Sequence, residues 1–481
     1  MNRVVRWFLA AVCLVSVVSV ARAADRPNFI IIFADDQGYG DLGCYGSPNI
    51  DTPHLDRMAA EGVRFTSFYA APFCGPSRAA LLTGCYPPRL SLAFNHGPKA
   101  STGIHANEIT LPEILKKQGY ATMHIGKWHL GDAPPFLPTR HGFDQYFGLP
   151  FSNDMWPYHP KMPPRENEDA RMKAARQRAA YTGFAGAGTF YPPGRGFPHP
   201  LPLMSGEKVI ETNPDQTQLT TRYTEKALQF IDDHQQQPFF LYLAHAMPHV
   251  PLFVSDKFAG KSPRGLYGDV MMEVDWSAGQ ILAHLKKRNL DGKTLVIYTS
   301  DNGPWLQYGI DGGSAGPLRL GKGTSYEGGM RVPTIMRWPG KIPRGSRSDE
   351  IAANMDLLPT LAALAGAALP DDRVIDGRNL WPLMSGVAGA HGHQAFYYFG
   401  GSGRSRKPNL RAVRSGQWKL HLARENNRFR GTELYDLYGD VSESRNRLAD
   451  HPDIASKLAA QAEAFYTKLN KNIRPLGKLA P

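Results

Sequence analysis

Residues 28–36 read NFIIIFADD, an unbroken apolar run that ends in two aspartates. Runs of this kind, with β-branched residues at the centre, are typical of a strand buried on both faces, as in parallel sheets. Similar runs follow at 239–244 (FFLYLA) and 294–300 (TLVIYTS), and Ala121–Ile125 also reads as a strand. We therefore expect these segments to lie together in a largely parallel sheet.

Helical patterns separate these predicted strands. Thr110-Leu-Pro-Glu113 is a capping box with Pro in the first turn, and Gly119 is placed to end that helix. Two further helices are expected near 216–236 and 265–288. Strands that alternate with helices predict a doubly wound α/β fold, with a mostly parallel sheet flanked by helices.

Two regions depart from this alternation. Residues 152–213 are rich in Pro, Gly, Arg and aromatics with little periodicity, which is typical of a variable surface insertion near a pocket. From residue 370, short β-like runs precede a helix near 454–469; they are 395–399, 410–414, 418–422 and 433–436. We expect a large α/β domain at 24–369 and a small α+β subdomain at 370–481, built from an antiparallel sheet and a helix.

Composition limits the class of protein. The chain has 481 residues, 42% of them hydrophobic, and only four cysteines, so it is neither a disordered chain nor a disulfide-built scaffold. The formal net charge of +12 suits an anionic substrate or a polyanion, and on its own it would also suit nucleic acid.

The first 23 residues have the features of a secretory signal peptide. Arg3 and Arg6 precede an apolar run at 7–20, and Ala21-Arg22-Ala23 forms a small-x-small cleavage site. The alternative is a membrane anchor, but the run is short for a spanning helix and no later segment is suitable. We therefore expect an exported protein, periplasmic or secreted, without stable membrane insertion.

Cleavage would remove Cys13 and leave three cysteines: Cys44, Cys74 and Cys85. In an exported protein, an odd number means that at least one cysteine has a role other than intramolecular pairing. If Cys74 has that role, Cys44 and Cys85 are free to pair with each other.

Polar residues follow two of the predicted strands directly. Asp35 and Asp36 follow the first, and Asp301 and Asn302 follow the strand at 294–300. Ligands in open α/β sheets bind at the carboxyl ends of strands. Three carboxylates and an amide gathered there favour a hard divalent cation, Ca²⁺ over Mg²⁺ if the shell exceeds six ligands. The alternative for Asp35 and Asp36 is a helix cap or a turn.

Cys74 is predicted to begin a helix. Pro76 suits a first turn and Ala79-Ala-Leu-Leu82 continues it, so Cys74 would lie where free N–H groups favour an anion. Arg78, one turn on, would point back to the same place. The alternatives are a buried or paired cysteine, or a reactive thiolate.

These residues belong to a longer pattern. Cys74-x-Pro-Ser-Arg78-x-x-x-Leu82-Thr83-Gly84 resembles the signature of the type I sulfatases, in the alkaline-phosphatase superfamily. Gly126-Lys127-Trp128-His129-Leu130-Gly131 resembles the second signature of that family. Further similar blocks are Ser300-Asp301-Asn302-Gly303, Gly321-Lys322-Gly323 and Tyr326-Glu327-Gly328-Gly329. The resemblance covers nearly the whole mature chain and is greatest to the arylsulfatase A and N-acetylgalactosamine-6-sulfatase branch.

The resemblance implies a calcium-dependent sulfuric ester hydrolase. Cys74 would be oxidised to formylglycine by a maturation enzyme, and the hydrated aldehyde would attack sulfur. Ca²⁺ would be held by Asp35, Asp36, Asp301, Asn302 and the side chain at position 74. Arg78 and His129 would hold and deprotonate the hydrate. Sulfate would be bound by Lys127, Lys322 and Ser152. His249 would protonate the leaving group or bind sulfate.

Each of these residues also has an ordinary reading. Lys127 and Lys322 could be surface lysines, His129 could be a satisfied loop histidine, and the motif around Ser152 is looser than the others. Only their joint occurrence, in the family's order, favours the catalytic reading. His245, which no motif contains, is expected to pack locally at a strand end.

The expected substrate is a sulfated carbohydrate or an aryl sulfate, and nucleic acid is not expected as a partner. Aromatic residues of the insertion would stack on sugar rings or pack within their own loop; they are Trp156, Tyr158, His159, Tyr181, Phe184, Phe190 and Tyr191. One alternative is a phosphodiester or phosphonate monoester hydrolase of the same superfamily. Another is a non-catalytic polyanion-binding protein with an unoxidised Cys74.

Overall fold

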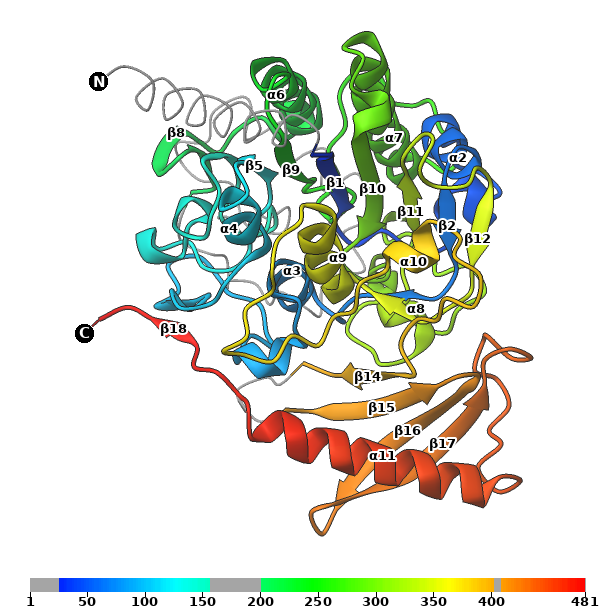
Figure 1. Cartoon of the computed structure of the whole chain (residues 1–481). Helices are drawn as coiled ribbons and strands as arrows, with labels where there is room; N and C mark the ends of the chain where they lie inside the picture. Colours follow the sequence, from blue (N-terminus) through cyan, green and yellow to red (C-terminus); the bar gives the residue numbers. More distant parts are fainter. Residues whose placement is uncertain (1–25, 156–199, 402–407, 481) are drawn as a thin grey trace, which may run out of the picture.

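The computed structural model of the chain describes residues 26–155, 200–401 and 408–480 (Figure 1). The predicted signal peptide at 1–23 and the aromatic residues of the insertion between Trp156 and Tyr191 lie outside these residues. Within the described residues, no helix is both long and apolar enough to cross a membrane.

The large domain is built on a ten-stranded mixed sheet with the order β12-β2-β11-β10-β1-β9-β5-β6-β7-β8. Its five central strands run parallel, and they are β10 (Thr294–Ser300), β1 (Asn28–Ala34), β9 (Phe239–Ala244), β5 (Ala121–Gly126) and β6 (Gln145–Gly148). Every residue of β1, β9 and β10 is buried. The prediction that the three apolar runs form central parallel strands is confirmed.

The outer strands make the sheet mixed. On one side β11 (Thr334–Arg337) is antiparallel to both β10 and β2 (Val63–Phe65), and β12 (Ser346–Ser348) runs parallel to β2. On the other side β7 (Pro202–Ser205) is antiparallel to β6, and β8 (Lys208–Thr212) at the edge is antiparallel to β7. These two strands fall within residues 152–213, so the described end of the predicted insertion extends the sheet.

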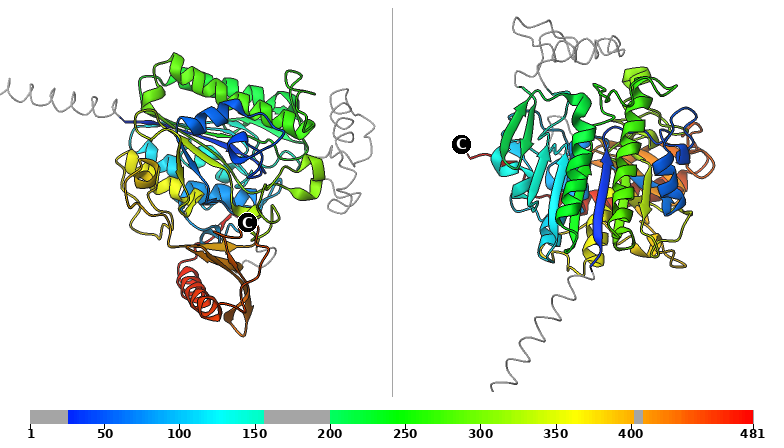
Figure 2. Two further views of the ribbon diagram at one scale, coloured as in Figure 1. Left: turned by 90° about the vertical axis from the view of Figure 1, so that its right-hand side faces the viewer. Right: turned by 90° about the horizontal axis from the view of Figure 1, so that it is seen from above.

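Helices cover both faces of this sheet, as the doubly wound prediction requires (Figure 2). Successive residues of β1 point to opposite faces, so Ile30 and Ile32 join one core, and Phe29, Ile31 and Phe33 the other. The first core contains residues of α2 (Pro53–Ala60), α6 (Leu219–Asp233) and α7 (Leu266–Lys287). The second contains residues of α3 (Cys74–Thr83), α4 (Leu111–Lys116), α9 (Leu357–Leu364) and α10 (Trp381–Met384). The predicted capping box of α4 is present, with the Thr110 N–H donating to Glu113 Oε2 at 2.7 Å.

The C-terminal part forms a separate layer beneath the large domain (Figure 2). It is an antiparallel sheet of β14 (Ala395–Phe399), β15 (Leu410–Ser415), β16 (Trp418–Glu425) and β17 (Arg428–Asp436), with α11 (Pro452–Asn470) packed on it. The prediction of a small antiparallel sheet with one helix is confirmed. Tyr69 and Ala80 of the large domain belong to the same core as this sheet, so the two parts pack directly on each other.

Short elements complete the connections. β3 (Phe68–Tyr69) pairs with β13 (Ala352–Ala353), and β4 (Thr102–Gly103) pairs with β18 (Gly477–Lys478) near the C-terminus. The four-residue helix α8 (Glu327–Met330) lies between the two sheets.

The hypothesis that Cys44 and Cys85 form a disulfide is wrong for this fold. Both thiols are free, and they lie on opposite sides of the large sheet. Cys44 packs against the core that contains α7, whereas Cys85 is part of the core that contains α9. The ten-stranded sheet therefore separates Cys44 from Cys85, although the number of cysteines in the mature chain suggested that they could pair.

Candidate active site

The polar residues that follow β1 and β10 meet at the carboxyl edge of the sheet. Ala34 and Ser300 are register partners at the ends of these strands, so the next residues of both strands are neighbours. The Asp36 N–H donates to Asp301 Oδ1 at 3.0 Å, and Asn302 Nδ2 donates to Asp36 Oδ1 at 2.7 Å. All are buried. The parallel register thus brings together two pairs of consecutive polar residues that are far apart in the sequence.

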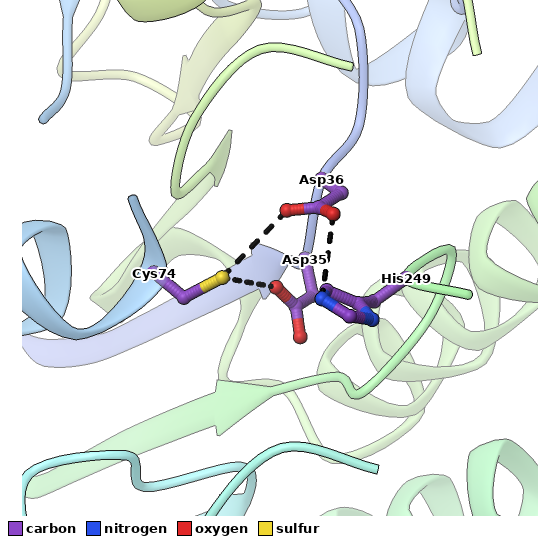
Figure 3. A group of neighbouring side chains, drawn as sticks. All are labelled: Asp35, Asp36, Cys74 and His249. Atoms are coloured by element: carbon purple, nitrogen blue, oxygen red, sulfur yellow. Dashed lines mark hydrogen bonds and ion pairs between the residues drawn. The ribbon is translucent and has the colours of Figure 1, made fainter. Parts of the chain in front are cut away.

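Cys74 is the first residue of α3 and points into this cluster (Figure 3). Its Sγ lies 3.2 Å from Asp35 Oδ1 and 3.6 Å from Asp36 Oδ1. Burial raises the pKa of the Cys74 thiol well above its usual value, and the carboxylates of Asp301 and Asp35 raise it further. This environment favours the neutral thiol, so the geometry does not support the reading of Cys74 as a reactive thiolate.

Cationic side chains surround the carboxylates. Lys127 Nζ contacts Asp35 Oδ2, Arg78 Nη2 lies 2.8 Å from Asp301 Oδ2, and Lys322 Nζ lies 2.6 Å from Asp36 Oδ1. Both lysines are buried, which excludes the reading of either as a surface lysine. Burial raises the pKa of Asp35, but the Lys127 charge, followed by His249 and Arg78, more than offsets this and brings it to about 2. Asp35 is therefore ionised.

Two histidines face the cluster from separate loops. His249, after β9, places Nε2 3.5 Å from Asp36 Oδ2 (Figure 3). His129, after β5, places Nε2 3.0 Å from the carbonyl oxygen of His96. Burial lowers the pKa of His129 well below 6.5, and the charges of Lys127 and Arg78 lower it further. Because a carbonyl only accepts, Nε2 carries the proton and Nδ1 of the neutral ring can accept one.

The residues present fit a hard cation. Ligand atoms of Asp35, Asp36, Cys74 and His249 all lie within 4.8 Å of one another. The Asn302 amide nitrogen donates to Asp36 and to the Gly303 carbonyl, while its buried Oδ1 has no hydrogen-bond partner. Buried polar atoms normally have partners, and an amide oxygen beside carboxylates is a typical Ca²⁺ ligand. Among the described residues this acidic cluster therefore fits a bound metal ion.

Comparison with known proteins agrees with this geometry. The sulfatase family profile matches residues 27–367, and the profile of the N-sulphoglucosamine sulphohydrolase C-terminal region matches residues 320–470. The chain belongs to the sulfatase family. It is a sulfuric ester hydrolase with the alkaline-phosphatase-like sulfatase fold.

Similar proteins place this sulfatase near the branch that the sequence predicted. It is 41% identical to arylsulfatase A of Bos taurus over 406 residues, which cover 83% of this chain and 75% of the relative. It is also 41% identical to N-acetylgalactosamine-6-sulfatase of Canis lupus familiaris over 428 residues, 86% of this chain and 75% of the relative. Among solved structures, Ps i-CgsB superposes with a TM-score of 0.77 and 31% identity, covering 93% of this chain and 94% of that one.

The site of this sulfatase also contains residues that sequence reasoning missed. Trp305 packs against His249 with 5.5 Å between ring centres, and Lys322 Nζ lies 4.4 Å from the centre of the Trp305 ring. Asp154 is fully buried; burial raises its pKa, but the charges of His249 and Lys127 bring it below the usual value. Asn95 Oδ1 accepts the Gly75 N–H at 2.9 Å and so holds the start of α3. The sequence offered a single hint for two of these residues. Asp154 lies two positions after Ser152, and Trp305 lies two positions after Gly303.

Proposed function

We propose that this sulfatase uses formylglycine made from Cys74, together with Ca²⁺, to release sulfate from a sulfated carbohydrate or an aryl sulfate. The observation that carries the proposal is the position of Cys74. Its Sγ lies within hydrogen-bond range of Asp35, Asp36 and Lys322 at the start of a buried helix. A nucleophile in that position would lie next to the proposed Ca²⁺ site and next to the lysine side chains that would bind sulfate.

The proposed calcium ligands are Asp35, Asp36, Asp301, Asn302 and the side chain at position 74. The orphaned Oδ1 of Asn302 and the paired carboxylates of Asp35 and Asp36 support this assignment. When bound, the cation would polarise a sulfate oxygen and offset charge that develops in the transition state.

The chain's own residues would bind the sulfate and move protons. Lys127 Nζ and Ser152 Oγ are 3.1 Å apart and would bind sulfate oxygens together with Lys322. His129 Nδ1 would accept a proton from the residue at position 74, with Arg78 holding that residue in place. His249 Nε2 would donate a proton to the leaving oxygen or bind sulfate.

A glycan substrate is supported by charge and by the relatives. The full chain carries a net charge of +12, and removal of residues 1–23, which hold three arginines and no acid, would leave +9. The structural relative Ps i-CgsB, 30% identical in its complex, was solved with k-i-k-neocarrahexaose.

We further propose that residues 1–23 direct export to the periplasm or the medium. Residues 24–369 would form the catalytic domain, with a substrate-side insertion at 152–213, and residues 370–481 would form a subdomain. A formylglycine-generating enzyme would act on Cys74 before or during export.

Mass spectrometry of the tryptic fragment that contains position 74, from enzyme made in its native host, tests the proposal. We expect the mass lost when –CH₂SH becomes –CHO, bound calcium in the purified protein, and faster turnover of nitrophenyl sulfate than of nitrophenyl phosphate. Chelation of calcium should lower that turnover, and added Ca²⁺ should restore it. Preference for phosphate or phosphonate esters would favour the phosphodiester or phosphonate reading. An unoxidised Cys74 in folded protein that turns over neither these esters nor sulfated oligosaccharides would favour a polyanion-binding protein.

A further inference from the structure

A cavity of about 590 Å³ lies between the large sheet and the C-terminal sheet, and it shares no lining residue with the active site. Its charged lining is strongly basic and comprises Arg64, Arg331, Arg347, Arg414 and Asp349. Four arginines against one aspartate leave three extra positive charges in the lining, and the ion pair of Arg331 with the buried Glu327 reduces this excess to two. An excess of this size in a concave site favours an anionic ligand.

Two of these arginines are fixed in place. The Arg414 side chain is 1% exposed and donates to the Gly416 carbonyl at 2.9 Å and to Ser67 Oγ at 3.2 Å. Arg331, 8% exposed, donates to the Thr66 carbonyl and pairs with Glu327 at 3.3 Å. Guanidinium groups that are already ordered lose little entropy when they bind a sulfate or a carboxylate.

The other two arginines lie nearer the solvent. Arg64 donates to the Cys44 carbonyl and stacks over the Tyr45 ring at 5.2 Å, and within the described residues it forms no ion pair. Arg347 is exposed and pairs with Asp349 at 2.8 Å. Tyr438, 70% exposed, adds an aromatic ring to the lining, a surface on which sugar rings can stack.

The cavity lies at the same sheet edge as the active site. β2 is antiparallel to β11, which is antiparallel to β10, so β2 and β10 end at the same edge. Thr66 and Ser67 follow β2, as Asp301 follows β10. Neighbouring strands are about 4.8 Å apart, so two to three strand spacings place the cavity roughly 10–15 Å from the active site along this edge. That distance corresponds to a few sugar units.

We propose that this arginine cavity is a second anion-binding site, which binds a sulfate or carboxylate group of an anionic glycan some sugar units from the ester that is cleaved. This inference rests on the proposed function for the glycan nature of the substrate. It predicts that long anionic substrates gain affinity from the cavity, whereas a small aryl sulfate does not.

Titration calorimetry with a dextran sulfate hexasaccharide tests the cavity directly. The double variant Arg64→Gln/Arg347→Gln is compared with Arg445→Gln/Lys468→Gln, which removes two exposed charges elsewhere. We expect the cavity variant to bind the hexasaccharide at least tenfold more weakly than the wild type, and the control to stay within twofold. Tyr438→Glu, which keeps all four arginines and adds a negative charge, should also weaken binding.

Turnover of nitrophenyl sulfate separates this inference from the proposed function. Both double variants should hydrolyse it at the wild-type kcat/KM, which also verifies that they are folded. Equal hexasaccharide affinity in the two double variants, or unchanged affinity in Tyr438→Glu, would overturn the cavity proposal. If converted wild-type enzyme hydrolyses neither nitrophenyl sulfate nor sulfated oligosaccharides, the proposed function is wrong, while the binding comparison still decides whether the cavity binds anions.

Discussion

Lys322 illustrates how single residues of this site are held by several groups at once. Its ammonium contacts both carboxylate oxygens of Asp36, lies 3.4 Å from Cys74 Sγ, and rests over the ring of Trp305. Burial lowers the pKa of Lys322, but the Asp36 charge more than offsets this and raises it above the usual value, so the side chain is charged. This position beside the residue at 74 supports the proposal that Lys322 binds a sulfate oxygen.

We expect Lys322→Ala to reduce kcat/KM for nitrophenyl sulfate by about 10- to 100-fold, because a charged hydrogen bond contributes about 1.5–3 kcal/mol. Steady-state kinetics on fully converted enzyme measures this, with the exposed Lys341→Ala as the matched control. Equal kcat/KM values for the two variants would remove Lys322 from the proposed sulfate-binding set.

His245 shows the structural role expected of it from the sequence. It is completely buried against α7, with Nε2 3.3 Å from Ser277 Oγ, and burial lowers its pKa from 6.5 to about 4. The unfolded chain therefore binds a proton more readily than the folded protein between these two pH values. Stability is complete above pH 6.5 and falls as the pH drops toward 4.

We expect His245→Gln to lessen this loss of stability, by up to about 3 kcal/mol at pH 4 relative to the change in the wild type. Urea unfolding at pH 7 and pH 4.5 measures the difference. Because the substitution also changes stability at pH 7, the test is the change between the two pH values. An unchanged pH dependence would mean that His245 does not titrate on unfolding.

At the scale of elements, the site depends on close contact between the loop after β10 and the segment that forms α8. The Gly303 N–H donates to the Gly329 carbonyl at 3.1 Å, and a methyl group at Gly303 would overlap the carbonyl oxygen of Gly328. This contact fixes the Asn302 loop against the segment that follows Lys322. Glycines at 303 and at 328–329 thus allow the backbone after β10 to approach the backbone of α8 closely.

We expect Gly303→Ala to destabilise the protein by about 1–3 kcal/mol or more, because overpacking forces the backbone to move. It should also lower kcat/KM more than tenfold by separating Asn302 from Lys322. Thermal unfolding and steady-state kinetics measure the two effects. Gly292→Ala is the control, since a methyl group there has no neighbour within 4 Å. If both variants behave alike, the close approach is not needed for the site.

At the scale of the whole molecule, a buried ion network joins the C-terminal sheet to the segment of the large domain that carries Lys322 and α8. Lys419 of β16 lies 2.9 Å from Glu327 of α8 and 2.9 Å from Glu443, and all three side chains are fully buried. Glu327 also accepts hydrogen bonds from Tyr69 of β3 and Tyr398 of β14. The segment that carries Lys322 is therefore anchored on both parts of the molecule.

We expect Lys419→Met to lower the free energy of unfolding by about 3–5 kcal/mol, because it removes the buried cation that Glu327 and Glu443 share and leaves them with only Arg331 and His421. Urea unfolding measures this, and the exposed Lys471→Met is the control. Adding Glu443→Gln to Lys419→Met should recover part of the loss by removing one unpaired charge. A loss no larger than that of the control would show that the network contributes little.

The sequence alone determined four of the five central strands, all but β6, together with the C-terminal sheet and the chemical types gathered at the site. β1, β9 and β10 could be predicted because strands buried on both faces need unbroken apolar runs. β8 could not, since its residues are mostly exposed and lack a regular alternation. Lys127 and Lys322 could be proposed only jointly, because a lysine by itself carries no signal of burial.

The tertiary structure alone decided which of these groups meet. The parallel register of β1 and β10 brings Asp36 to Asn302, and the sheet between Cys44 and Cys85 keeps those thiols apart. Trp305, Asp154 and the arginine cavity belong to no motif, because their neighbours come from distant parts of the chain. Local patterns record which surfaces are buried, whereas the contacts between charges depend on how strands and sheets pack in space.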